Sequence, residues 1–395
     1  MTQSSFLKNY SKSIIFVMVL LIALVIEPYL GLQVKQFVYG ISLLIKNLLI
    51  FCLPFVIFCL INNSIAKLGS QALKYIALII PLICLSNFVN TFISYGISKA
   101  VIDLGVIGKL SVANANDGLQ PAFTINLSQL LSNNVALLCG VISGLILGIG
   151  KTRQMPKICG IFEKITHYFF KILVPIMPVF IAGTAIKLQH DGIMGDVCTK
   201  YMPVLLTFVS IAYGYVFLQF CVLARFNFSV VGKYITNLTP AFVTAFGSMS
   251  SAASLPLVIK GSAQNVKKPE NANIILPAVI NIHLVGDCFF IPLMALTVMT
   301  SFGMDFPGIA VYLPFALHFI LAKFSVAAVP GGGVLVMFPI MQSYLNMSAD
   351  MLAIVTALYL LFDPLITTCN VAGNSAMAII FDRITGVFKK QKPLQ

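Results

Sequence analysis

The chain has 395 residues, of which 59% are hydrophobic and only 9% are charged, and its mean hydropathy is +0.97. This composition excludes a soluble globular protein, and several apolar runs of about 20 residues are each long enough to span a bilayer. Transmembrane β-barrels show short alternating segments instead, so we expect an all-α polytopic membrane protein.

The net charge of +13 could indicate a nucleic-acid partner, but the placement of the charges argues against one. Most of the basic residues lie in six segments that flank apolar runs, as the positive-inside rule describes. We therefore expect a lipid bilayer and no nucleic acid as partner, and an integral protein of the plasma membrane, such as a bacterial inner membrane. Both termini are predicted to be cytoplasmic. The six segments are Lys8–Lys12, Lys67–Lys74, Lys151–Lys164, Arg225–Lys233, Lys260–Lys268 and Arg383–Lys392.

The nine cysteines are scattered, and they form no CxxC pair. We interpret them as small apolar residues rather than as disulfides or metal ligands, and we expect no certain metal site.

The first half of the chain reads as a series of transmembrane spans separated by polar or charged connections. We predict spans at about 14–30, 41–61, 75–102, 130–149, 168–188 and 202–223. The segment 110–127 is polar and rich in turn formers, and it is expected on the outer side.

The pattern changes after residue 233. Residues 241–260 (AFVTAFGSMSSAASLPLVIK) are apolar at both ends, serine-rich in the middle, and flanked by lysine on both sides. A span cannot begin and end on one side of the membrane, so this segment predicts a re-entrant hairpin that enters from the cytoplasm. A broken backbone at membrane depth is tolerated where it is buried in protein or lines a cavity.

A second unit of the same kind follows. A helix at about 274–300 is interrupted at 281–287 (NIHLVGD), and AAVPGGG at 327–333 separates the apolar arms 311–324 and 334–341. The arms predict a hairpin that enters from the outside. Two units of hairpin and interrupted helix with opposite orientation indicate an inverted repeat around a midplane site, as in secondary transporters.

The final helix carries a polar stripe. Asp363, Ile366, Thr367, Asn370 and Asn374 fall at i, i+3, i+4, i+7 and i+11, which is one helix face. A carboxylate at membrane depth is costly unless it faces a cavity or a partner, so the stripe predicts a substrate or ion site.

Five segments in order resemble the dicarboxylate/amino acid:cation symporter family, the glutamate transporters and their prokaryotic homologues. LLIKNLLIFCLPFVIFCL is similar to the family's second helix, AFGSMSSAASLP to its first hairpin and HLVGD to its NMDGT signature. VPGGG resembles its VPGAG hairpin tip, and DPLITTCNVAG resembles its DMGRTMVNVTG. The resemblance covers nearly the whole chain.

The resemblance implies eight transmembrane helices, two re-entrant hairpins and a homotrimer that moves a small-molecule substrate by an elevator mechanism. Residues 1–233 would form mainly the scaffold, with helices 3 and 6 joining the transport domain. Residues 234–388 would form the core of the transport domain, and 389–395 a cytoplasmic tail. We expect no tightly bound cofactor and a coupling ion that is H⁺ or Na⁺.

Carried over position by position, the resemblance places a substrate site on both hairpins and on the last helix. An aspartate that holds the substrate's amino group matches Asp363, whereas the arginine that holds an acidic side chain matches Ile366. Some members place that arginine at the position of Met249 instead. Since an acidic substrate would lose its bidentate partner, we favour a neutral amino acid. The substrate-site positions are Ser250, Ser251, Val329, Pro330, Gly331, Asp363, Ile366, Thr367 and Asn370.

The cation sites of the family also differ here. Two sodium-binding aspartates match Val285 and Asn374, and a serine near another sodium site matches Lys323. A lysine ammonium cannot coordinate a cation, but it can replace one as a tethered charge. We therefore expect proton coupling rather than full sodium coupling. The candidates for ion coupling are His283, Asp287, Lys323, Asn370 and Asn374.

Each of these residues also has a structural interpretation. Asp363 could be neutralised by Lys323, Asp287 could cap the helix interruption, and His283 could bond a free carbonyl. If the helix were continuous, His283 and Asp287 would be i, i+4 neighbours. Lys323 could extend its side chain to the membrane interface.

Three other functions remain as alternatives. The first is a sodium-coupled symporter of glutamate, aspartate or dicarboxylates, and the second is a sensor that no longer transports. The third is an intramembrane aspartyl protease, suggested by Asp287 and Asp363, although their motifs occur in reversed order. We expect that the chain is not an enzyme, because no credible hydrolase triad assembles either.

Overall fold

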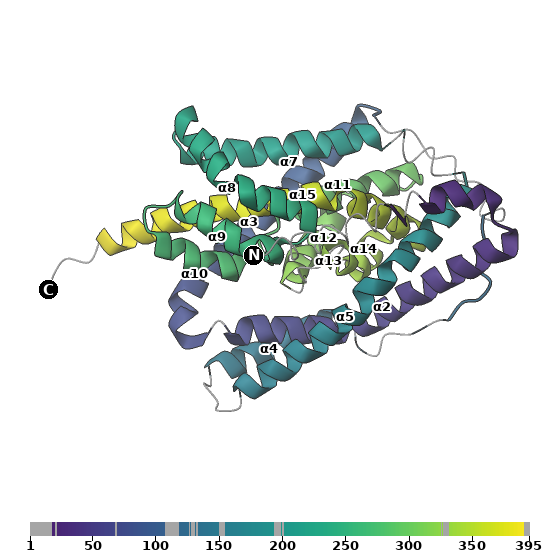
Figure 1. The fold of residues 1–395 in the computed structure, drawn as a ribbon, viewed down its shortest axis with the longest axis horizontal. Coiled ribbons are helices and arrows are strands. Elements are labelled where there is room, and N and C mark those ends of the chain that lie inside the picture. The colour runs from purple at the N-terminus through teal and green to yellow at the C-terminus, as the bar shows by residue number, and fades with distance from the viewer. Residues whose placement is uncertain are drawn as a thin grey trace.

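The computed structural model describes residues 18–390 except 20–21, 68, 107–117, 126, 128–130, 132, 150–154, 193–198, 200, 325 and 327–331. The described residues form α-helices and one short 3₁₀ helix, with no strand among them. The expected all-α class is therefore confirmed (Figure 1).

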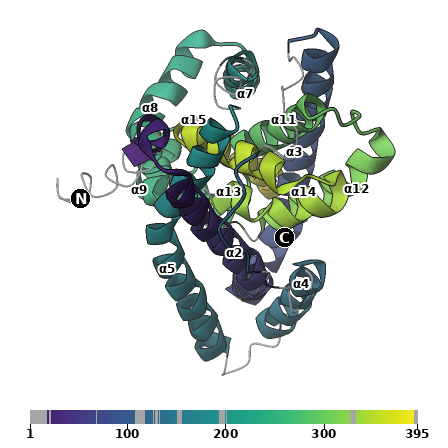
Figure 2. The ribbon, with the colours of Figure 1, turned by 90° about the vertical axis from the view of Figure 1, so that its right-hand side faces the viewer.

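Three long helices form what we call the outer group. Helix α2 (Leu32–Lys67) packs against α4 (Asn133–Ile149) and α5 (Met155–His190). Close packing of α2 and α5 depends on Gly183, because a Cβ there would lie 2.7 Å from the Val38 carbonyl oxygen. The group occupies one side of the molecule in both ribbon views (Figures 1 and 2).

The remaining helices form what we call the core group. Helix α15 packs against α7 to α11, and α3 packs against α11 and α12. The outer and core groups meet where α5 contacts α15 and where α4 contacts α3. The core-group helices are α3 (Gly69–Asp103), α7 (Met202–Leu223), α8 (Phe228–Ser248), α9 (Ser251–Ala263), α10 (Pro269–Val279), α11 (Val285–Ser301), α12 (Ile309–Lys323), α13 (Gly332–Leu335), α14 (Phe338–Leu345) and α15 (Ala349–Lys390).

Helix α11 lies at the centre of the core group. Every residue of α11 except Thr300 is buried, and a helix that is apolar on all sides belongs in the interior. Polar groups on α3 bind its carbonyls: Ser94 donates to the Phe289 oxygen at 2.7 Å. Helix α12 is tied to α3 in the same way, since the Tyr312 hydroxyl donates to the Thr91 oxygen at 2.8 Å. These bonds satisfy polar groups that water cannot reach.

Two of the three predicted backbone breaks lie in the described residues, and both occur where the sequence indicated them. The arms α8 and α9 of the first hairpin meet at Met249, which has a left-handed backbone (φ 47°), and Ser250 caps α9 by accepting a bond from the Ala253 amide. Helices α10 and α11 are separated by residues 280–284. His283 and Asp287 therefore do not share one continuous helix. Of the second tip, residues 327–331 lie outside the described residues.

Three described helices are long and apolar enough to cross a membrane by length and composition: Ile79–Asp103, Met202–Leu223 and Asp350–Gly386. Shorter apolar helices include α11 and α12. Residues 14–17 and 20–21 of the expected span at 14–30, and residues 110–117 and 126 of the segment 110–127, lie outside the described residues.

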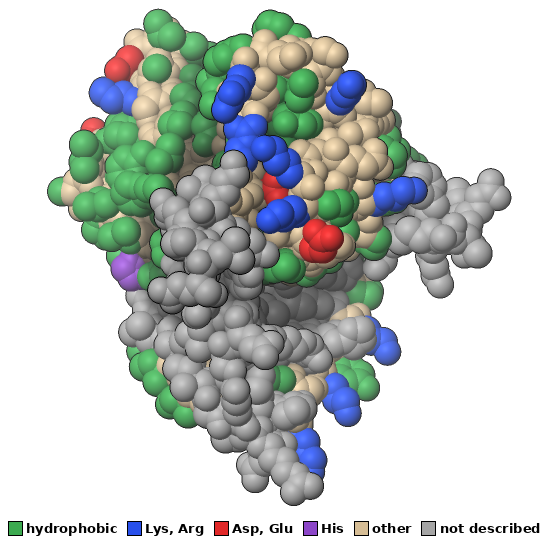
Figure 3. All heavy atoms as spheres, turned by 90° about the vertical axis from the view of Figure 1, so that its left-hand side faces the viewer, with side chains coloured by type: hydrophobic (Ala, Val, Ile, Leu, Met, Phe, Trp, Pro, Cys, Tyr) green, Lys and Arg blue, Asp and Glu red, His purple; other side chains and the backbone are tan. Residues whose placement is uncertain are grey.

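Basic side chains gather on the end of the molecule where α8 begins and α9 meets α10 (Figure 3). Exposed basic residues there include Lys233, Lys260, Lys267 and Lys268. This is the end that the charge pattern of the sequence predicts to be cytoplasmic.

The two arms of the first hairpin approach so closely that Gly261 has no room for a side chain. A Cβ there would collide with the backbone oxygen of Asn237. We expect Gly261→Ala to lower the free energy of unfolding by about 1–3 kcal/mol through overpacking. Thermal unfolding in detergent, followed by circular dichroism, measures this loss.

The matched control is Gly232→Ala on the same hairpin, where an added Cβ would meet nothing within 4 Å beyond its own helix. Alanine there should be neutral or stabilising by up to about 1 kcal/mol through helix propensity. Equal unfolding temperatures for the two variants would contradict the packing argument.

Candidate functional site

A small pocket lies where the first hairpin, the break before α11 and the middle of α15 come together. The centre of a water-sized sphere can move through about 30 Å³ of this pocket. No lysine or arginine is among the described residues that line it. The lining residues are Met249, Ser251, Ile280, Asn281, Leu284, Asp287, Val326, Gly333, Tyr359, Asp363, Thr367 and Asn370.

The polar stripe of α15 forms one wall of this pocket. Asp363, Thr367 and Asn370 are all buried, with 2%, 4% and 3% of their surfaces exposed. The Thr367 hydroxyl donates to Asp363 Oδ1 at 2.8 Å, one helical turn away. The stripe therefore presents a carboxylate to the pocket as the sequence predicts.

A second carboxylate, Asp287, lies in the first turn of α11 and is held by three partners. The Tyr359 hydroxyl donates to Oδ1 at 2.7 Å, and the Asn370 side-chain amide donates to Oδ2 at 2.7 Å. The Lys323 ammonium lies 3.6 Å from Oδ1. The position near a helix N-terminus also favours a negative charge.

Asn370 joins the last helix to the start of α11. Its Oδ1 accepts a hydrogen bond from the Gly286 amide at 2.7 Å and a longer one from the Asp287 amide at 3.4 Å. The N-cap of α11 is Leu284, whose side chain makes no capping bond. Asn370 thus supplies from another helix the cap that the local sequence lacks.

Lys323 ends the first arm of the second hairpin and is completely buried. Its Nζ lies 4.3 Å from the centre of the Phe319 ring and, among the described residues, has no hydrogen-bond partner. The side chain therefore does not reach the membrane interface. It pairs with Asp287. The structural interpretation of the sequence instead pairs Lys323 with Asp363.

The second arm of the same hairpin reaches this cluster through Gly333. A Cβ on Gly333 would collide with Asp287 Oδ1 and with the Tyr359 hydroxyl. Since only glycine fits there, the backbone of the hairpin lies directly against the Asp287 carboxylate. Both arms of the hairpin thus contact Asp287, one by charge and the other by close approach.

His283 lies in the break between α10 and α11 and is 1% exposed. Its Nε2 is 2.9 Å from the Ser86 hydroxyl on α3, and its Nδ1 is 3.3 Å from Asn374 Oδ1 on α15. An amide oxygen only accepts, so a neutral His283 carries its hydrogen on Nδ1 and accepts from Ser86. The carbonyl partner expected for a structural histidine is replaced by two side chains.

The structure brings five of the predicted residues into the pocket and distributes the others around it. The five are Ser251, Asp287, Asp363, Thr367 and Asn370. Ser250 is the neighbouring helix cap, and Ile366 is buried behind the wall, where its carbonyl oxygen packs against Gly286. His283, Lys323 and Asn374 do not line the pocket, and Val329, Pro330 and Gly331 lie outside the described residues.

Several residues of the site were not predicted from the sequence. Tyr359 is four positions before Asp363 and so shares its helix face, which is a signal that could have identified it. Asn281 lies within the predicted interruption. Ser86 has no local signal, because only the packing of α3 against the break brings it to His283.

Comparison with known proteins identifies the family to which this arrangement belongs. The sequence model of the Sodium:dicarboxylate symporter family matches residues 12–384. The chain belongs to this family. The expected resemblance to this family is confirmed.

Relatives of the chain include transporters from animals and bacteria. Excitatory amino acid transporter 1 of Ambystoma tigrinum is 24% identical over 61% of this chain and 45% of its own length. The Serine/threonine transporter SstT of Streptococcus thermophilus is 20% identical over 84% of this chain and 85% of its own. The human Neutral amino acid transporter B(0) is 27% identical over 36% of this chain and 26% of its own.

The matches cover less than half of the length of the excitatory amino acid transporters. These relatives are transporters by name, which confirms that the chain is not an enzyme. The alternative of an intramembrane protease is thereby set aside.

Because Asp287 and Lys323 are both buried and paired, we expect the stability of the fold to fall strongly when only one of the two charges is removed. Lys323→Met leaves Asp287 without the one described cation within 4.0 Å, and removing one partner of a buried pair costs about 3–5 kcal/mol. We expect Lys323→Met to be strongly destabilised and the double variant with Asp287→Asn to recover much of the loss. Thermal unfolding of the four proteins in this cycle measures the coupling.

Lys99→Met is the control, because its partner Asp103 and Lys99 itself are more than half exposed. An exposed pair contributes about 0.2–1 kcal/mol. If the double variant were no more stable than Lys323→Met alone, the two residues would not be coupled.

Proposed function

We propose that this chain is a secondary active transporter of neutral amino acids, coupled to protons rather than fully to sodium. One observation carries the proposal: the pocket is lined by two buried carboxylates, Asp287 and Asp363, and by no lysine or arginine among its described lining residues. Such a pocket attracts an ammonium group and offers nothing to a second substrate carboxylate.

The substrate's amino group would bind Asp363, which Thr367 orients. Its α-carboxylate would lie toward the N-terminus of α9 at Ser251, where helix amides favour an anion. Its side chain would face the apolar part of the lining, which includes Met249, Ile280 and Leu284. Apolar residues stand at both positions where family members place a substrate arginine, Met249 and Ile366, so a neutral side chain is the better fit.

Coupling to protons is supported by the residues at the family's sodium positions. The Lys323 ammonium beside Asp287 would act as a tethered cation in place of a bound one. Asn374 stands at another of the family's sodium positions, and its side chain contacts His283. A protonated His283 could donate hydrogen bonds to both Ser86 and Asn374. The two neighbours can therefore hydrogen-bond the neutral and the protonated imidazole alike. His283 or Asp363 would carry the proton, with Asn370 coupling the last helix to α11.

Membership of the family supports the wider architecture that we propose. We propose eight transmembrane helices with two re-entrant hairpins, a homotrimer, and cytoplasmic termini in a bacterial inner membrane. The outer group would be the scaffold, and the core group, including α3 and α7, would slide across the bilayer. The thin contact between the groups supports such a division.

Uptake into proteoliposomes tests the proposal. We expect alanine, serine or leucine to accumulate under an inwardly directed proton gradient, with little change when sodium is replaced by potassium. Asp363→Asn should reduce uptake at least tenfold, because the substrate ammonium loses its counter-charge. Asp305→Asn, an exposed carboxylate outside the pocket, serves as the control.

Uptake of glutamate, aspartate or succinate with a steep dependence on sodium at fixed pH would refute the proposal and favour a sodium-coupled acidic-substrate symporter. Specific binding of neutral amino acids without accumulation under any ion gradient would favour a sensor instead.

A further inference from the structure

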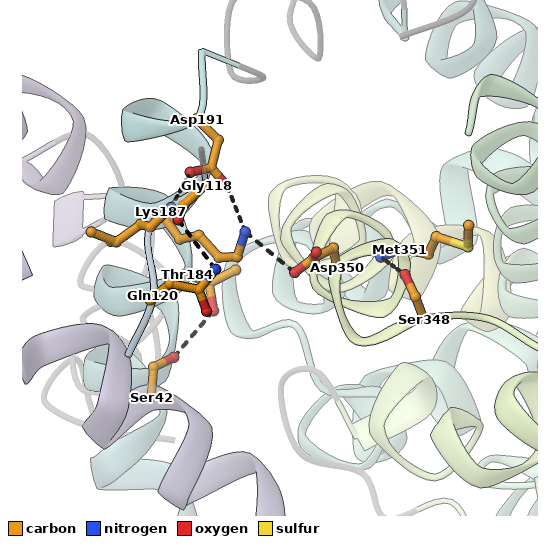
Figure 4. Close-up of polar contacts among 10 residues, drawn as sticks. Ser42, Gly118, Gln120, Thr184, Lys187, Asp191, Ser348, Asp350 and Met351 are labelled. Carbon is orange, nitrogen blue, oxygen red and sulfur yellow. Dashed lines mark hydrogen bonds and ion pairs between the residues drawn. The ribbon is translucent and has the colours of Figure 1, made fainter. Parts of the chain in front are cut away.

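A second charged cluster lies away from the pocket, where the last turn of α5 faces the start of α15. The Lys187 ammonium is 2.5 Å from Asp191 Oδ2 and 3.4 Å from Asp350 Oδ1. Figure 4 shows the Lys187 side chain extending from α5 toward Asp350 across the space between the two helices. The contact crosses from the outer group to the core group.

Each partner is also stabilised within its own group. Lys187 also forms an ion pair with Asp191, and its ammonium lies 5.6 Å from the centre of the Tyr39 ring. Asp191 in turn accepts a hydrogen bond from the Leu119 amide at 2.8 Å. Asp350 lies in the first turn of α15, near the positive end of the helix dipole.

A comparison of solvent exposure with the Lys323–Asp287 pair shows why the Lys187–Asp350 contact can open. Both side chains of the Lys323–Asp287 pair are buried, at 0% and 2% exposure, so separating them would strand a buried charge. The side chain of Asp350 is 43% exposed, and Lys187 retains Asp191 when Asp350 leaves. Breaking the Lys187–Asp350 contact therefore strands neither charge.

We propose that the Lys187–Asp350 ion pair is a latch that holds the core group in its present position against the outer group. The latch opens each time the groups slide, so its strength sets how often the other position is occupied. This inference rests on the proposed elevator movement, and it assigns to two residues outside the substrate pocket the control of that movement.

The test measures the distance between the two groups directly. Spin labels are placed at Ile161 on α5 and Ile309 on α12, which are 55% and 62% exposed, in a variant whose native cysteines are replaced. Labelled protein is diluted with unlabelled protein, and pulsed electron paramagnetic resonance gives the distance distribution. Asp350→Asn should reduce the population at the present distance about two- to fivefold relative to the other, as expected for a partly exposed pair.

Two further variants separate the latch from general effects on folding. Asp350→Glu keeps the charge and should restore much of the original distribution. Asp103→Asn removes an equal charge from an ion pair that lies within α3 alone, and it should change nothing. High salt should act on the unaltered protein in the same direction as Asp350→Asn, because it screens the exposed carboxylate.

Identical two-position distributions for the unaltered protein and Asp350→Asn would overturn the latch and leave the proposed function standing. A single distance in every variant, with and without substrate, would overturn both the latch and the sliding movement on which it depends.

Discussion

The site depends on the Asp287 carboxylate, which is buried at the start of α11 and held by three side chains from two other elements. Tyr359 and Asn370 approach it from α15, and Lys323 approaches it from the first arm of the second hairpin. A buried charge requires such partners, so the hairpin, the broken helix and the last helix are stable in one arrangement relative to each other. Any ligand of the neighbouring pocket enters a site whose polar groups are already organised.

The helix breaks explain why these groups can converge. A continuous helix through residues 280–284 would leave no free amides at Gly286 and Asp287 for Asn370 to cap. The left-handed backbone at Met249 likewise turns the first hairpin so that Ser251 reaches the pocket. Irregular backbone at membrane depth is costly because its polar groups lack partners. In this protein, side chains from distant segments supply hydrogen bonds to such groups.

The sequence allowed the helical class, the breaks and much of the site to be predicted, because each leaves a local pattern. The stripe from Asp363 to Asn370 follows from helix periodicity, and the interruption at 281–287 from its polar residues. Contacts between different helices leave no local pattern in the sequence and could not be predicted in this way. Lys323 pairs with Asp287 rather than Asp363, and His283 meets Ser86, because packing and not spacing decides these partners. The first hairpin extends from Phe228 to Ala263, beyond the predicted 241–260, because apolar runs mark only part of its arms.

We propose that the pocket selects a neutral amino acid without needing sodium. A thermal-shift screen of the purified protein against amino acids and dicarboxylates, with and without sodium and across pH, tests it most directly. A ligand at about 100 times its Kd stabilises the folded protein by about 2.7 kcal/mol. We expect neutral amino acids to raise the unfolding temperature in sodium-free buffer. Stabilisation by glutamate, aspartate or dicarboxylates alone, and only with sodium present, would contradict it.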